Sequence, residues 1–128
     1  MIGIWNAYSD IYLYVVGVGM LVTFGIPAVL VPARWAQLFR WKIQQPDDLA
    51  LFMTRSLSVV CAVIAVFAIK VVNIPAAQPF FFDLLLWTFI AMTLVHVHGA
   101  ITKAQPKNET IEIIMWVVFI LATLVFHP

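Results

Sequence analysis

The chain has 128 residues, of which 64% are hydrophobic and only 10% carry a charged side chain. Soluble domains carry about 25% charged residues, so this chain has too few charges to cover a water-facing surface. The formal net charge of +1 excludes the broad basic footprint of a nucleic-acid-binding protein. The composition therefore predicts an integral membrane protein that contacts lipids.

Four apolar runs are long enough to cross a bilayer as helices, which takes about 20 residues each. They cover Ile11–Val31, Leu49–Val72, Phe80–Ile101 and Thr110–Phe126. Apolar residues are continuous within each run and do not alternate, which argues against a transmembrane barrel. We therefore expect an all-α fold in which residues 1–128 form a single four-helix, four-span transmembrane domain.

The connection between the first two runs contains a short amphipathic segment, Pro32–Lys42. A proline suits the first position of a helix, and a helix from Pro32 places Trp35, Leu38 and Phe39 on one face. We interpret the segment as an interfacial helix in the headgroup layer; a loop with tryptophan anchors is the alternative. The residues expected to contact lipid there are Arg34, Trp35, Arg40, Trp41 and Lys42.

The orientation follows from the seven Lys and Arg residues. Six of them lie on the side of the first and third connections, and Lys70 lies on the other side. Because short loops rich in Lys and Arg stay in the cytoplasm, we expect these connections to be cytoplasmic and both termini extracytoplasmic. A cell inner membrane fits this bias best. The six are Arg34, Arg40, Lys42, Arg55, Lys103 and Lys107.

Four ionisable residues fall at similar depths below the expected cytoplasmic face: Arg55, His96, His98 and Glu112. Ionisable side chains in a membrane are costly and usually face a partner or a water-filled cavity. The simpler interpretation is charge compensation, with Arg55 paired to Glu112 or Glu109 or reaching lipid phosphate. Their functional role is a polar pocket that binds a lipid headgroup or a small anion.

No metal site is expected, because His96 and His98 diverge and no cluster of Cys or Asp joins them. His96 and His98 are two residues apart, so on a helix they point about 200° away from each other. One of them could still be an axial ligand to haem or to a chlorophyll-type pigment in a larger complex. Cys61 is the only cysteine and lies in an apolar run, so we expect an inert thiol.

Catalytic signatures such as G-x-S-x-G, H-E-x-x-H and C-x-x-C are absent from the sequence. Asp47 and Asp48 are expected to cap the second span, and Asp83 to lie in the first turn of the third. Gly17, Gly19 and Gly25 make the first span thin, which suits close helix packing within the bundle or against another subunit.

Arg55 early in the second span, followed by Leu86-Trp87-Thr88-Phe89 and His96 in the third, resembles a family of small four-helix membrane proteins. The family includes the sterol-biosynthesis scaffold protein of the endoplasmic reticulum and DoxX-like bacterial proteins. The resemblance covers the second and third spans. It implies a non-enzymatic scaffold or accessory role, and it does not imply sterol chemistry.

Two functions follow as expectations. The first is a non-catalytic accessory or scaffold subunit of a larger membrane complex, with other membrane subunits or further copies of the chain as partners. The alternative is a membrane protein that binds a lipid, a small anion or a cofactor (haem or pigment) in the cytoplasmic leaflet. Neither requires an enzyme activity.

Overall fold

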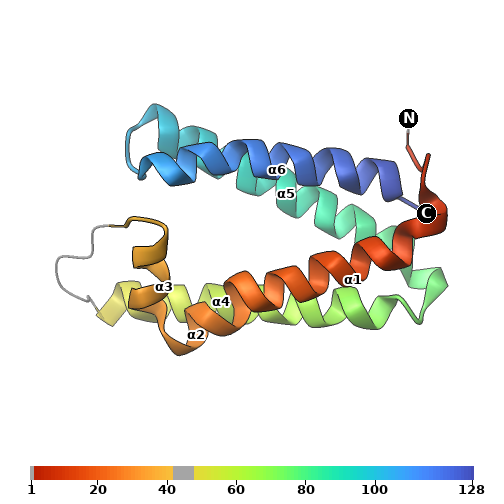
Figure 1. Ribbon diagram of the computed structural model, residues 1–128, viewed down its shortest axis with the longest axis horizontal. Helices are drawn as coiled ribbons and strands as arrows, with labels where there is room; N and C mark the ends of the chain where they lie inside the picture. The colour runs from red at the N-terminus through yellow and green to blue at the C-terminus, as the bar shows by residue number, and fades with distance from the viewer. Residues whose placement is uncertain (1, 42–47) are drawn as a thin grey trace. The chain divides into compact units, whose positions relative to one another are not determined.

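The computed structural model describes residues 2–41 and 48–128, which are almost entirely helical and contain no β-strand. The expected all-α fold is therefore confirmed (Figure 1). The chain divides into two compact units, one of residues 13–73 and one of residues 1–12 and 74–128. Each unit is described by itself. The single domain predicted for residues 1–128 stays a prediction.

Four helical segments in the described residues are long and apolar enough to cross a membrane. They are Asn6–Leu30, Asp48–Val71, Pro75–Ile101 and Lys107–Phe126. Each contains most of one predicted span. The first, third and fourth begin three to five residues earlier than predicted, because residues that flank the apolar runs join the helices. Length and composition thus agree with a multi-pass membrane protein.

The unit of residues 13–73 is built on close contact between the first and second spans. Helix α1 (Ser9–Met20) is followed by a π-helical turn (Leu21–Gly25) and α2 (Ile26–Leu30), and α4 (Asp48–Val71) packs against the last two. A Cβ placed on Gly17 would lie 2.8 Å from the carbonyl oxygen of Ala65 on α4. The predicted small-residue packing is therefore used within this unit.

Pro27 explains an unusual contact in the same unit. Proline has no backbone N–H, so it cannot donate to the carbonyl of Thr23 four residues earlier. The indole N–H of Trp35 donates to that carbonyl instead, at 2.7 Å. The Trp35 ring also packs against Phe24 and Phe39, with ring centroids 5.7 and 4.9 Å away. Trp35 thus connects the end of the first span to the segment that follows it.

That segment is the short helix α3 (Pro32–Leu38). It begins at Pro32, as predicted, but ends four residues before Lys42. Arg40 adopts a left-handed conformation (φ 64°), and the Arg40 and Trp41 amides donate to the carbonyls of Gln37 and Ala36. These two bonds form a Schellman motif, which terminates a helix. Leu38 is 77% exposed, so it does not pack within the unit as Trp35 does, and the predicted lipid-facing apolar face stays a prediction.

The other unit is a helical hairpin of α5 (Gln78–Ile101) and α6 (Lys107–Phe126), which lie side by side (Figure 1). A second Schellman motif ends α5: Lys103 has φ 56°, and the Lys103 and Ala104 amides donate to the Ala100 and Gly99 carbonyls. Pro106 is extended and precedes the first residue of α6. The connection is therefore shorter than predicted.

At the opposite end of the hairpin, the N-terminal segment packs on the end of α6. The Ser9 hydroxyl donates to the Phe126 carbonyl at 2.6 Å, and the Tyr12 and Thr123 hydroxyls are 2.6 Å apart and buried. Asp83 was predicted in the first turn of the third span, and this is wrong because α5 begins at Gln78. Its carboxylate lies 3.2 Å from the His127 imidazole instead.

Candidate functional site

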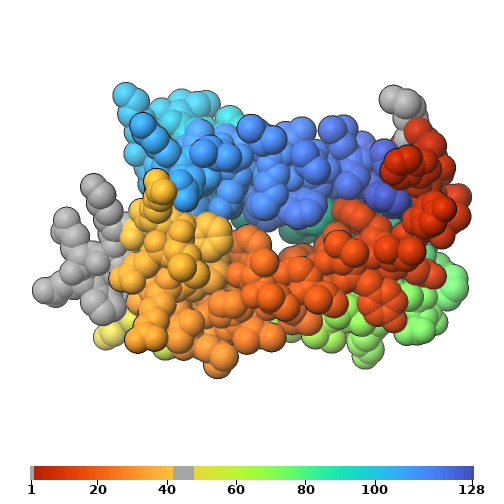
Figure 2. Space-filling view, in the orientation of Figure 1, coloured from red at the N-terminus to blue at the C-terminus, as the bar shows by residue number. Residues whose placement is uncertain are grey.

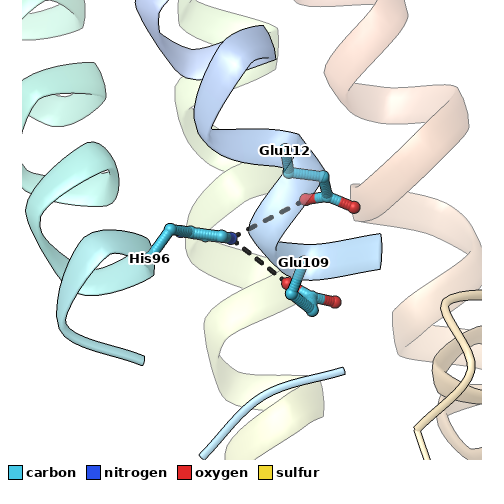
Figure 3. A group of neighbouring side chains, drawn as sticks. All are labelled: His96, Glu109 and Glu112. Carbon is cyan, nitrogen blue, oxygen red and sulfur yellow. Dashed lines mark hydrogen bonds and ion pairs between the residues drawn. The ribbon is translucent and has the colours of Figure 1, made fainter. Parts of the chain in front are cut away.

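Three ionisable side chains meet where α5 ends and α6 begins. His96 comes from α5, and Glu109 and Glu112 come from α6 (Figure 3). The Nε2 atom of His96 lies 3.2 Å from Oε2 of Glu109 and 3.7 Å from Oε2 of Glu112. We call these three residues the His96 cluster. It combines one imidazole with two carboxylates.

The start of α6 explains why both glutamates face α5. The helix begins at Lys107, so Glu109 lies in its first turn, where a negative charge interacts favourably with the helix dipole. Residues three apart on a helix share a face, which places Glu112 beside Glu109. The Gln105 side chain also donates to the backbone carbonyl of His96 at 3.0 Å. The connection thus holds the end of α5 against the glutamates.

The His96 ring is fixed in orientation by its own helix. Its Nδ1 lies 2.8 Å from the carbonyl oxygen of Met92. A carbonyl can only accept, so Nδ1 carries a hydrogen and Nε2 is the atom that faces α6. The Trp116 indole N–H is 3.4 Å from Nε2, and the two rings pack with centroids 5.6 Å apart. Nε2 is thus directed at the two carboxylates.

The cluster is shielded from solvent in the described structure. The side chains of His96, Glu109 and Glu112 are 7%, 14% and 15% exposed, respectively. Charges taken out of water are costly unless an opposite charge or hydrogen bonds compensate them. The cluster combines two acidic side chains with one basic one, so these three groups together attract a cation rather than an anion.

The predicted site residues divide between the two units. His96 and Glu112 come together, as the shared depth of these residues suggested. His98 is exposed, in agreement with the predicted divergence from His96. Arg55 belongs to the other unit, where its Nε donates weakly to the Val29 carbonyl at 3.4 Å. The gathering of Arg55 with the other three stays a prediction.

Glu109 was considered from the sequence only as a possible partner of Arg55, and its place beside His96 was missed. It was assigned to the connection before the fourth span, because the apolar run begins only at Thr110. The available signal was the E-x-x-E spacing of Glu109 and Glu112 after Pro106. A proline followed by a polar turn is a helix start, and extending α6 back to Lys107 puts both carboxylates on one face.

The predicted interfacial residues are placed on and after α3. Arg34 and Arg40 are exposed, as lipid-contacting cations would be. Trp35 is only partly exposed, because its indole N–H and ring are used within the unit. Trp41 lies past the end of the helix, and Lys42 falls outside the described residues.

The cofactors considered from the sequence can be compared with this geometry. The Nε2 of His96 is surrounded by Glu109, Glu112 and Trp116. Axial ligation of a haem or pigment at Nε2 would have to displace these side chains. A single ion needs far less room. Each cluster residue offers one ligand atom, and the three atoms lie within 4.8 Å of one another.

Comparisons with known proteins found no protein-family model, no curated protein and no solved structure that matches this chain. The function is therefore inferred from the residues of the chain itself.

Proposed function

We propose that this chain is a non-catalytic, multi-pass membrane protein that binds a positively charged ligand at the His96 cluster. One observation carries the proposal: two shielded carboxylates converge on one imidazole nitrogen inside helices apolar enough to cross a membrane. Ionisable groups in such segments usually face a partner or a ligand pathway. A bound cation would be a ligand of that kind.

The geometry changes the ligand class expected from the sequence. A small anion or a lipid phosphate would need Arg55 as its partner and would be repelled by Glu109 and Glu112. A cation is attracted by the same two groups. The ligand of the His96 cluster is therefore proposed to be a cation. The position of the cluster in the cytoplasmic leaflet is still inferred from the sequence alone.

Thermal unfolding of the purified chain in detergent tests this proposal. The melting temperature is measured with K⁺, Zn²⁺, Mn²⁺ or choline added to the wild type, His96→Gln, Glu112→Gln and His98→Gln. A ligand at 100 times its Kd stabilises the folded state by about 2.7 kcal/mol. We expect at least one cation to stabilise the wild type and the exposed-histidine control His98→Gln, but not the two cluster variants.

Two outcomes would contradict the proposal. One is that no cation changes the melting temperature of the wild type. The other is that a cation stabilises all four proteins equally, which would place binding elsewhere. Because glutamine is close in shape to glutamate, Glu112→Gln keeps the helix packing and remains informative if His96→Gln is poorly folded.

The proposed orientation rests on the distribution of Lys and Arg. Six of seven lie on the side of the first and third connections, so we propose that these face the cytoplasm of an inner membrane and that both termini are outside. The exposed Arg34 and Arg40 would then meet anionic lipids, at about 1 kcal/mol for each cation near the surface.

Cysteine labelling checks this orientation in a Cys61→Ala background. A cysteine at Asn6 should react with an impermeant thiol reagent in intact cells, and a cysteine at Gln105 should react only after the membrane is opened. The reverse pattern would place both termini in the cytoplasm and the His96 cluster near the outer leaflet.

A second candidate function is that of an accessory or scaffold subunit, which the resemblance to small four-helix proteins also implies. The observation that favours it is the open space beside Gly19. A Cβ placed on this residue would meet none of the described residues within 4 Å. The neighbouring Val15, Val22 and Ile26 are exposed. Such a face lets another helix approach closely.

Cross-linking and mild-detergent purification test the accessory role. A stoichiometric membrane partner, or a second copy of the chain, should be recovered with the wild type and lost with Gly19→Leu. Recovery of the wild type only as a monomer, with no cross-linked product, would refute it.

A further inference from the structure

We propose that the ligand of the His96 cluster is a divalent first-row transition metal ion, held by Nε2 of His96 and by carboxylate oxygens of Glu109 and Glu112. This inference rests on the proposed cation site and names the class of cation. Figure 3 shows the arrangement on which it depends: the imidazole of α5 points at both carboxylates of α6.

The spacing of the three ligand atoms fits a metal ion. Zinc binds His nitrogen and carboxylate oxygen at about 2.0–2.2 Å, so two tetrahedral ligands lie about 3.3–3.6 Å apart. The two distances from Nε2 to Oε2 of the glutamates are 3.2 and 3.7 Å. All three ligand atoms lie within 4.8 Å of one another. Small rotations of the two glutamate side chains would complete the site.

The bond from Nδ1 of His96 to the Met92 carbonyl supports the same conclusion. Metal-ligating histidines almost always donate their other ring N–H to a carbonyl or carboxylate, which fixes the tautomer and leaves a lone pair for the metal. The 2.8 Å contact with Met92 does this. The Trp116 N–H is 3.4 Å from Nε2, a long hydrogen bond that a metal would readily replace.

The two carboxylates favour a divalent ion over a monovalent one. The attraction between a carboxylate and a cation is proportional to the charge of the cation. A divalent ion is therefore attracted more strongly to Oε2 of Glu109 and Glu112 than a monovalent ion at the same distance.

The ligand set also selects among divalent ions. Mg²⁺ and Ca²⁺ prefer oxygen ligands, whereas imidazole suits Zn²⁺, Fe²⁺ and their neighbours. Affinity for such sites rises from Mn²⁺ to Cu²⁺ and falls again at Zn²⁺, which still binds more tightly than Mn²⁺. We therefore expect Zn²⁺ to bind more tightly than Mn²⁺, and Mg²⁺ to bind far more weakly than either.

Zinc titration of the full chain tests the inference. The protein is purified in detergent with an affinity tag that contains no histidine, treated with a chelator, and titrated against a fluorescent zinc indicator. We expect one Zn²⁺ per chain. His96→Gln, Glu109→Gln and Glu112→Gln should each weaken binding at least about tenfold, while His98→Gln should change it less than about twofold.

Three outcomes would overturn the metal inference: no Zn²⁺ binding at one per chain, equal binding by His96→Gln and His98→Gln, or tighter binding of Mg²⁺ than of Zn²⁺. If choline or K⁺ stabilises the wild type through the cluster while Zn²⁺ does not bind, the metal inference fails and the cation site stands. If no cation binds, both fail.

Discussion

The hydrogen bond from Trp35 to the carbonyl of Thr23 predicts that the stability lost on mutation of Trp35 depends on the presence of Pro27. Trp35→Phe keeps an aromatic ring beside Phe24 but removes the indole N–H that now bonds this carbonyl at 2.7 Å. Pro27→Ala restores a backbone N–H four residues after Thr23. The single change Trp35→Phe should therefore cost more stability when residue 27 is proline than when it is alanine.

The size of this difference can be worked from the hydrogen bond. A protein hydrogen bond contributes about 0.5–1.5 kcal/mol, and a carbonyl left without a partner costs about 1–3 kcal/mol. The loss of ring volume at Trp35 is the same in both backgrounds and cancels in a double-mutant cycle. We expect a coupling energy of about 1 kcal/mol, which is about fivefold in the unfolding equilibrium.

Equilibrium unfolding in mixed detergent micelles, followed by the helical circular dichroism signal, measures the four proteins of the cycle. Coupling that exceeds the roughly 0.3–0.5 kcal/mol expected for independent sites would support the assignment. Additive effects of Trp35→Phe and Pro27→Ala would show that the Thr23 carbonyl does not need the indole N–H, and would refute the reasoning.

Three further predictions concern packing and turns. Gly17→Val should destabilise the fold by more than about 2 kcal/mol, because its Cβ would lie 2.8 Å from a backbone carbonyl oxygen. The control Gly19→Val should be nearly neutral. Thermal melting of the two variants checks this difference. Tyr12→Phe removes the buried 2.6 Å contact with Thr123 and should cost about 1–2 kcal/mol, measured by detergent unfolding. Lys103→Gly should stabilise by about 0.5–1 kcal/mol, because glycine adopts a positive φ without strain; an unchanged melting temperature would contradict this.

Much of the fold could be predicted because lipid imposes simple requirements on a sequence. Each of the four apolar runs must satisfy its backbone hydrogen bonds internally, so each becomes a helix of about 20 residues. The start of α3 could also be predicted, because the proline at position 32 is compatible with the first helical turn. Helix α6 is the blue segment in Figure 2. Its apolar residues Ile114 and Leu121 are exposed, as expected of a helix that faces lipid.

The details that escaped prediction depend on polar residues at helix ends. Arg40 and Lys103 both terminate helices in the left-handed conformation that glycine usually adopts. Neither arginine nor lysine prefers this conformation, so the sequence does not predict these helix ends. Asp83 was misplaced because Gln78 and Pro79 were assigned to a loop rather than to α5.

The candidate site was only partly predictable for the same reason. His96 and Glu112 could be found from the rarity of ionisable residues in apolar runs. Glu109 lies outside the apolar run, and its inclusion depends on α6 beginning at Lys107. Arg55 shares the expected depth of these residues, but depth gives no information about which helix faces a given side chain. Which side chains of neighbouring helices contact one another can be read only from the structure.

The most direct test of the proposed metal site is X-ray absorption at the zinc K-edge, on the full chain loaded with one Zn²⁺. We expect a first shell of nitrogen and oxygen atoms at about 2.0–2.1 Å with the outer-shell pattern of one imidazole, and loss of that pattern in His96→Gln. A sulfur atom at about 2.3 Å would place the zinc on Cys61. A shell of oxygen alone, or a spectrum unchanged by His96→Gln, would equally contradict the site at His96, Glu109 and Glu112.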